Sequence, residues 1–223
     1  MTPYHVLIPI LAVLVFFLIR AEFTFKKKQI YVIKPISTLI LIAVALLSLT
    51  RDGQFVHSYT LAITGGLLLS MGGDVSLMFM NESQKAFRTG LVLFLLAHIV
   101  YAIIFTMYSG FQCGIDLLSG GILLAIGAAL YIFLYPGLGN MKISVLAYIL
   151  IISLMVNRAV STFEGSFFNS TQAWMLTIGA GLFYISDIFI ALNRFWKPIK
   201  YNRISLSMYY SGQLLIAMST GFF

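Results

Sequence analysis

The chain has 223 residues, of which 60% are hydrophobic and only 9% are charged. Soluble domains usually carry about 25% charged residues, so this composition excludes an ordinary soluble enzyme and indicates an integral membrane protein. The net charge of +7 would also suit nucleic acid, but the basic residues lie in short connectors between apolar runs, where a membrane surface explains them. We therefore expect membrane lipids, and no nucleic acid, as partners.

Eight apolar runs follow one another along the chain, each close to the roughly 20 residues that a helix needs to cross the bilayer. We expect spans at 4–20, 31–50, 59–80, 88–108, 116–135, 142–160, 172–192 and 204–222. The runs are longer than the strands of a membrane barrel and lack their alternation. The first run has no basic residues before it and no cleavage site after it, which indicates a retained helix. The expected fold is a single all-α domain over residues 1–223, a multi-pass bundle of eight transmembrane helices.

The positions of lysine and arginine predict the orientation of this bundle, because cytoplasmic connectors are enriched in both residues. Only Arg51 and Arg158 lie on one side, and the other twelve of the 14 lie in or beside the odd-numbered connectors. These twelve are Arg20, Lys26, Lys27, Lys28, Lys34, Lys85, Arg88, Lys142, Arg194, Lys197, Lys200 and Arg203. The odd-numbered connectors are therefore expected in the cytoplasm and both termini outside, in what we expect to be the bacterial cytoplasmic membrane.

Two aspartates interrupt the apolar runs near their expected cytoplasmic ends. Asp74 and Asp187 each lie five or six residues before the end of a span. An ionisable residue inside a membrane costs about 2.5–3.5 kcal/mol on insertion scales, so it usually marks a functional site. Two carboxyl groups at low dielectric constant suit acid–base chemistry, since one can stay protonated while the other is ionised. The alternative is a structural role, with one aspartate paired with Lys34 and the other capped by tyrosine and serine hydroxyls.

Polar residues of three further spans are expected at a similar depth. Lys34 begins the second span, and Tyr209 and Gln213 lie near the start of the eighth. His98 and Tyr101 lie near the middle of the fourth. Five helices therefore bring polar side chains to the cytoplasmic half of the bundle, which predicts a buried polar site there.

Histidine and cysteine do not form a metal-binding pattern in this sequence. His98 is the one histidine expected inside the bundle, where a hydrogen-bonded packing role is the more common one. No HxxxH or HExxH spacing occurs, and Cys113 is the only cysteine. We therefore expect neither a metal nor a cofactor.

Six stretches of the chain, taken in order, form a recognisable pattern. They are residues 34–38 (KPIST), 70–78 (SMGGDVSLM), 87–101 (FRTGLVLFLLAHIVY), the pair 147–148 with Met155, 179–187 (GAGLFYISD) and 209–217 (YYSGQLLIA). Through them the chain resembles the YhhN family of membrane lysoplasmalogenases over nearly its whole length. It departs from the family pattern at Ile188, where a small polar residue is expected after the aspartate.

This resemblance implies an eight-helix fold that hydrolyses the vinyl ether bond of lysoplasmalogens to a fatty aldehyde and a glycerophospho-base. It implies that Asp74 and Asp187 are the catalytic pair and that a lysophospholipid is the substrate. The residues that it implies beside the pair are Lys34, His98, Tyr148, Tyr209 and Gln213. Ser70, Tyr101 and Ser186 join them as candidates by their positions on the same helices.

Other functions would also use intramembrane acids. A transporter of small solutes, or one coupled to ions or protons, is the main alternative, although its polar residues would be expected in both halves of the bundle. An intramembrane aspartyl protease would need a Gly-x-Gly-Asp pattern, whereas Gly72-Gly73-Asp74 has a different spacing. A lipid-binding protein without enzymatic activity is the third alternative, and nothing in the sequence predicts an oligomeric state.

Overall fold

The structure is a computed structural model that describes residues 4–50, 54–111, 113–199 and 202–222. Within these ranges the chain is helical, with short connectors and no strand. The α-helices are α1 (Tyr4–Phe23), α2 (Lys27–Leu46), α3 (Gln54–Met78), α4 (Gln84–Ser109), α5 (Cys113–Leu134), α6 (Lys142–Ser161), α7 (Ser170–Phe195) and α8 (Ser205–Met218). The prediction of an all-α protein with eight helices is therefore confirmed.

Seven of the described helices, α1 to α7, are long and apolar enough to cross a membrane. Helix α8 has 14 residues, fewer than the expected run at 204–222. Its ends continue as tighter 3₁₀ turns, η4 (Asn202–Ile204) and η5 (Ser219–Gly221). In η5 the Ser219 and Thr220 hydroxyls donate to the carbonyls of Ile216 and Ala217, three residues back, which favours the tighter winding.

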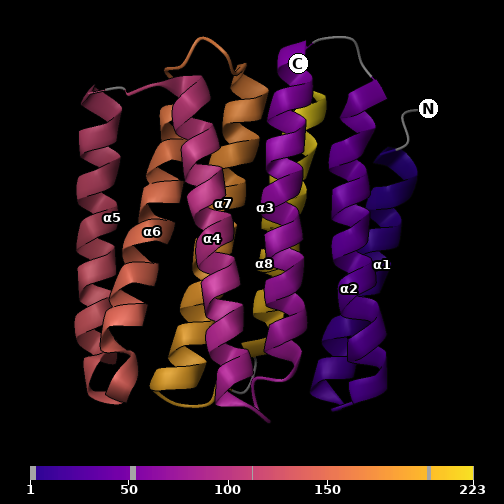
Figure 1. Cartoon of the computed structure of the whole chain (residues 1–223), viewed down its shortest axis with the longest axis vertical. Coiled ribbons are helices and arrows are strands. Elements are labelled where there is room, and N and C mark those ends of the chain that lie inside the picture. Colours follow the sequence, from indigo (N-terminus) through magenta and orange to yellow (C-terminus); the bar gives the residue numbers. More distant parts are fainter. Residues whose placement is uncertain (1–3, 51–53, 112, 200–201, 223) are drawn as a thin grey trace.

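Successive helices run in opposite directions, so the connectors before α2, α4, α6 and α8 lie at the same end of the bundle, the lower end in Figure 1. We call this end the basic end. Helices α2, α3 and α4 pack against one another in sequence, while α7 and α8 lie behind α4 and α3 (Figure 1). Helix α6 contacts both α4 and α7, α1 packs against α2 and α8, and α5 packs mainly against α6.

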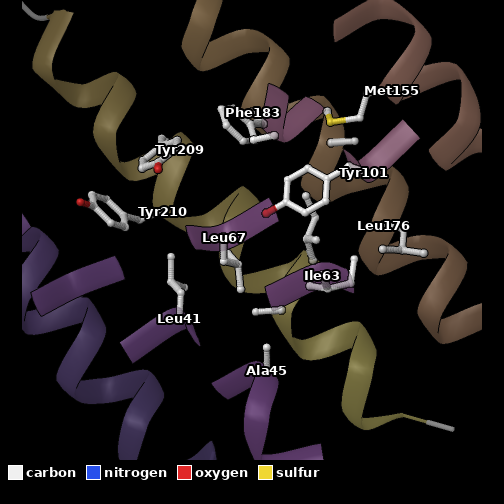
Figure 2. Close-up of a cluster of buried hydrophobic side chains, with 14 of the residues drawn as sticks. Leu41, Ala45, Ile63, Leu67, Tyr101, Met155, Leu176, Phe183, Tyr209 and Tyr210 are labelled. Atoms are coloured by element: carbon white, nitrogen blue, oxygen red, sulfur yellow. The ribbon is translucent and has the colours of Figure 1, made fainter. Parts of the chain in front are cut away.

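The core between these helices is built from large aliphatic and aromatic side chains. Figure 2 shows Leu41, Leu67, Tyr101 and Phe183, which come from α2, α3, α4 and α7 and are buried together. In a bilayer, the association of such helices is driven by close van der Waals packing of their side chains and not by the exclusion of water. The helices are therefore held at fixed separations, and polar residues on their inner faces are brought into register.

Helices α7 and α8 approach so closely that their backbones touch. A Cβ atom on Gly179 would lie 2.8 Å from the carbonyl oxygen of Gly212, and one on Gly212 would lie 2.6 Å from the carbonyl oxygen of Gly179. Only glycine fits at both positions, as in other membrane helix pairs with small residues at the contact. Asp187 lies two turns beyond Gly179, and Tyr209 lies one turn before Gly212, so this contact sets the distance between them.

At the opposite end of the bundle, a buried ion pair joins α5 to α6. Arg158 is 3% exposed, and its Nη2 lies 2.5 Å from Oδ1 of Asp116. Asn157 accepts hydrogen bonds from the Arg158 guanidinium and donates to Ser119 on α5. Arg158, which the sequence presents as a surface charge, is therefore a packing residue as well. Arg51 lies outside the described residues.

Candidate active site

Asp74 lies on the inner face of α3 and is 2% exposed. Its Oδ1 is 3.3 Å from the ammonium nitrogen of Lys34. Its Oδ2 accepts hydrogen bonds from the Thr38 hydroxyl at 2.9 Å and the Tyr209 hydroxyl at 2.8 Å. Residues of α2 and α8 thus surround this carboxyl group with three donors, one of which is a cation. Each of these three donors can stabilise a negative charge on the carboxyl group and so offsets part of the cost of burying it.

Local helix geometry explains why Lys34 and Thr38 meet the same carboxylate. They lie four residues apart on α2, which places them on one face. The Tyr210 hydroxyl donates to the backbone carbonyl of Lys34 at 3.3 Å and so ties α8 to the same turn. The structure thus contains the ion pair between Lys34 and an aspartate. A purely structural role of Asp74 would also produce this pair.

Asp187 lies on α7 in a different environment. The Tyr148 hydroxyl donates to its Oδ2 at 2.6 Å, and Nε2 of His98 lies 3.3 Å from the same oxygen. The side chain is 12% exposed, more than that of Asp74 at 3%. Its partners are hydroxyl and imidazole groups, and both contact Oδ2. Asp187 is therefore the more accessible carboxyl group and the one without a lysine beside it.

The imidazole of His98 is held in one orientation. It is fully buried, and its ring packs edge-on against Phe183 with the ring centres 4.6 Å apart. Nδ1 has no hydrogen-bond partner among the described residues. A proton on Nδ1 would be a buried N–H group without a partner, which is costly, so the geometry favours the tautomer with its proton on Nε2. From Nε2, His98 can donate to the Tyr148 hydroxyl at 3.1 Å or to Oδ2 of Asp187 at 3.3 Å.

Two cavities meet at Asp187. One lies among α3 to α7 and is almost entirely apolar, with Phe87, Leu130 and Ile149 in its wall. The other opens toward the basic end and is lined by both aspartates and by a set of polar residues. These are Lys34, Ser186, Tyr209, Glu22, Asn193 and Arg203. Asp187 belongs to both linings, together with Leu77, Phe94 and Ile190, so it is the polar residue in the wall that the two cavities share.

Three of the candidate residues form a separate chain of hydrogen bonds. The Tyr101 hydroxyl donates to Oε1 of Gln213 at 3.0 Å, and Nε2 of Gln213 donates to the Ser70 hydroxyl at 2.9 Å. All three side chains are fully buried. Ser70 lies one turn before Asp74, and Gln213 one turn after Tyr209. This chain of hydrogen bonds joins α3, α4 and α8 beside the two aspartates, and none of its three members lines either cavity.

The structure adds residues that sequence reasoning missed, among them Asn193 in the wall of the polar cavity. Thr38 donates a hydrogen bond to Asp74. The sequence feature that could have identified it is its position four residues after Lys34. Glu22 and Arg203 line the polar cavity, yet the sequence shows them only as charges near helix ends. Ile188, where the chain departs from the family pattern, lies in the wall of the apolar cavity. An apolar side chain fits that position.

The site has no ligand set for a metal ion. Across the described ranges, no three residues among histidine, cysteine, aspartate and glutamate are grouped so that they could hold one. The nearest partners of Asp74 are a lysine and two hydroxyl groups, which stabilise a carboxylate without a metal ion. The arrangement can hold one ionised and one protonated carboxyl group beside an apolar space.

Known proteins resemble this chain over most of its length. The model of the YhhN family matches residues 29–220. Lysoplasmalogenase TMEM86A of Bos taurus is 34% identical over 167 residues, which cover 73% of this chain and 66% of that protein. The human protein of the same name is 34% identical over 169 residues, with the same coverage of both chains. Lysoplasmalogenase TMEM86B of Sus scrofa is 30% identical over 168 residues.

The match spans just under two thirds of the length of these relatives, at 66% or 64%. No solved structure matches the chain. The family match covers all the residues around Asp74 and Asp187 except Glu22. The expected resemblance is thereby confirmed, and the chain belongs to the YhhN family.

Proposed function

We propose that this protein hydrolyses the vinyl ether bond of lysoplasmalogen-type lysophospholipids and releases a fatty aldehyde and a glycerophospho-base. The observation that supports the proposal is the meeting of an apolar and a polar cavity at Asp187. A lysoplasmalogen is divided in the same way, since its vinyl ether bond joins an apolar chain to a glycerophosphate headgroup. With the chain in the apolar cavity, that bond lies beside Asp187. The relatives, which are named as lysoplasmalogenases, support the same reaction.

The environments of the two aspartates suggest different roles. Asp74, paired with Lys34, serves as the carboxylate that stabilises positive charge. Asp187 borders the apolar cavity and is the more exposed of the two aspartates, so it is the one that can reach the vinyl ether, and we assign it the role of general acid. Because both of its hydrogen bonds fall on Oδ2, Oδ1 is the atom that carries this proton.

The reaction then proceeds in three steps. Asp187 donates its proton to the outer carbon of the vinyl ether, which forms a C–H bond and leaves an oxocarbenium cation at the inner carbon. The Asp74 carboxylate stabilises this cation and orients a water molecule, whose oxygen bonds to the inner carbon while its proton returns to Asp187. The resulting hemiacetal collapses: its C–O bond to glycerol breaks, and the hydroxyl proton passes to the glycerol oxygen.

Purified protein and a 1-alkenyl lysophospholipid test this proposal. We expect aldehyde, trapped as a hydrazone, from the alkenyl lipid and none from the matching 1-alkyl lipid, in which no carbon can accept the proton. A metal chelator is expected to leave the rate unchanged, because the described residues include no group of three or more histidine, cysteine, aspartate or glutamate side chains that could hold a metal ion. Absence of aldehyde from protein shown to be folded, or activity that depends on an added metal, would refute the proposed reaction.

We also propose that all eight helices span the membrane, with the basic end in the cytoplasm and both termini outside, in a bacterial inner membrane. The excess of lysine and arginine at that end supports this orientation. Exposed Cys113, at the start of α5, is expected to react with a membrane-impermeant maleimide in intact cells. Gln29→Cys in a Cys113→Ser background is expected to react only after permeabilisation. The reverse pattern would show that the basic end faces outward.

The transporter alternative gains no support from these observations. The polar groups around the aspartates gather toward the basic end, and the relatives are named as lysoplasmalogenases. A hydrolase at a lipid-accessible site accounts for both.

A further inference from the structure

A second ion pair lies in the wall of the polar cavity. Glu22, in the last turn of α1, and Arg203, in η4 before α8, both line this cavity together with Lys34 and Asp74. Nε of Arg203 lies 3.3 Å from Oε2 of Glu22. Their side chains are 27% and 13% exposed, so both are held within the protein and still reach the cavity.

Another ion pair at the basic end provides a contrast. Lys27 and Glu82 are 2.5 Å apart, and their side chains are 67% and 50% exposed. This pair lies on the surface between α2 and the connector after α3, and neither residue is part of the polar cavity lining. Surface pairs of this kind contribute little to stability. The Glu22–Arg203 pair therefore stands out because it is largely buried at a cavity, where desolvated charges require a partner or a ligand.

The pair has hydrogen-bonding capacity beyond its own contact. The contact uses Nε of Arg203, and the guanidinium group has four further N–H groups, in a planar arrangement suited to a phosphate. On Glu22 it uses Oε2, and the carboxylate has a second oxygen that can accept from an ammonium group. The two side chains thus offer an anion site and a cation site next to each other.

The charges around the cavity favour a ligand without net charge. Lys34 and Asp74 neutralise each other, as do Arg203 and Glu22, and Asp187 is neutral when protonated. A ligand with phosphate alone would bring one or two negative charges close to the Glu22 carboxylate. The two charges of a zwitterion cancel each other. Its ammonium group is attracted to the Glu22 carboxylate, which repels a ligand that carries only the phosphate.

We propose that Glu22 and Arg203 bind the zwitterionic headgroup of the lysophospholipid, with Arg203 at the phosphate and Glu22 at the amine. The inference rests on the proposed function for the identity of the ligand, and it assigns to this pair the choice among headgroups. Glu22 and Arg203 select the substrate by its head, while the apolar cavity accepts its chain. The reacting bond lies between them.

Binding of non-reacting lipids tests this assignment independently of catalysis. The probes are 1-alkyl lysophosphatidylethanolamine, 1-alkyl lysophosphatidic acid and 1-alkylglycerol, and their affinities for purified protein are measured in one detergent. Free glycerophosphoethanolamine is a fourth probe, which separates a lipid headgroup site from a site for the soluble head alone. We expect the wild type to bind the ethanolamine lipid most tightly, the uncharged lipid least tightly among the lipids, and the soluble head more weakly than the complete lipid.

Substitutions at the pair are expected to change these preferences in opposite directions. Arg203→Gln should weaken both phosphate-bearing lipids by about tenfold or more, the scale of one charge-assisted hydrogen bond, and leave 1-alkylglycerol unchanged. Glu22→Gln should weaken the ethanolamine lipid and strengthen the phosphate-only lipid, since it removes a negative charge from that side. Glu82→Gln, in the exposed pair, is the matched control and should change none of the affinities.

A pair that merely braces α1 against η4 would behave differently. Both substitutions would then lower thermal stability and weaken all three lipids equally, and this result would overturn the inference. So would a wild type that binds 1-alkylglycerol as tightly as the ethanolamine lipid, a result that needs no variant to fold. Headgroup selectivity without aldehyde release would leave this inference standing and refute only the proposed reaction. Aldehyde release without headgroup selectivity would refute this inference and leave the proposed reaction standing.

Discussion

Asp187→Asn is expected to lower the rate of aldehyde release by about 10²–10⁴-fold, the usual contribution of a general acid or base. Asparagine keeps the size of the side chain and can accept the Tyr148 hydrogen bond, but it cannot donate a proton to the vinyl ether. The fold is expected to survive, because the amide is uncharged, like the protonated acid, and no described lysine or arginine beside Asp187 loses an ion-pair partner. Turnover and thermal stability are measured on the same preparation.

Asp116→Asn is the matched control for this change. Asp116 is also a partly buried aspartate, 13% exposed, but it pairs with Arg158 at the opposite end of the bundle. Its replacement is expected to lower stability and to leave the rate per folded molecule near that of the wild type. A well-folded Asp187→Asn protein with near-normal turnover would contradict the acid role of Asp187.

Asp74→Asn is expected to abolish activity and to destabilise the protein as well. The change leaves the Lys34 ammonium buried, at 6% exposure, without its carboxylate partner. Breaking a buried ion pair from one side typically costs about 3–5 kcal/mol, because the remaining charge stays desolvated. The melting temperature and the rate of aldehyde release are therefore both expected to fall for Asp74→Asn, whereas only the rate is expected to fall for Asp187→Asn.

A second substitution separates the two effects at Asp74. Adding Lys34→Met to Asp74→Asn removes the unpaired charge and keeps an unbranched side chain of similar length, so stability is expected to recover. Activity is not expected to recover, since no carboxylate remains to stabilise the cation. Combining Asp74→Asn with Asp187→Asn should cost little more turnover than the worse single change, because groups that act as a unit are not additive. Recovery of turnover in the Lys34→Met, Asp74→Asn protein would show that the ion pair is structural and that Asp74 has no catalytic role.

Features that depend on short segments could be predicted from the sequence alone. The number of helices follows from the lengths of the apolar runs, whereas the helix ends do not: Asp74 lies four residues before the end of α3 and Asp187 eight residues before the end of α7. The shortened α8 could not be predicted in this way. Its Ser219 and Thr220 side chains bond to the backbone and tighten the last turn, although their run continues to look apolar.

The division of the polar residues between the two aspartates required the packed structure. The expected depths in the membrane placed Lys34, His98 and Tyr209 close together. They could not show that Lys34 and Tyr209 contact Asp74 while His98 contacts Asp187. Nor could it show that Ser70, Tyr101 and Gln213 form their own hydrogen-bonded chain beside the cavities. Glu22 and Arg203 meet only because α1 packs next to η4, near the other end of the chain.

The junction of the two cavities at Asp187 also bears on how the products leave. In the proposed function an intact substrate would occupy both cavities at once, so that binding of one end would raise the local concentration of the other. Hydrolysis under the proposed mechanism cuts the one bond that links these ends, and each fragment then keeps only its own half of the contacts. The aldehyde partitions into the bilayer and the glycerophospho-base diffuses into water. Under the proposed mechanism each fragment is therefore expected to bind more weakly than the intact lipid, which predicts weak inhibition by accumulated product.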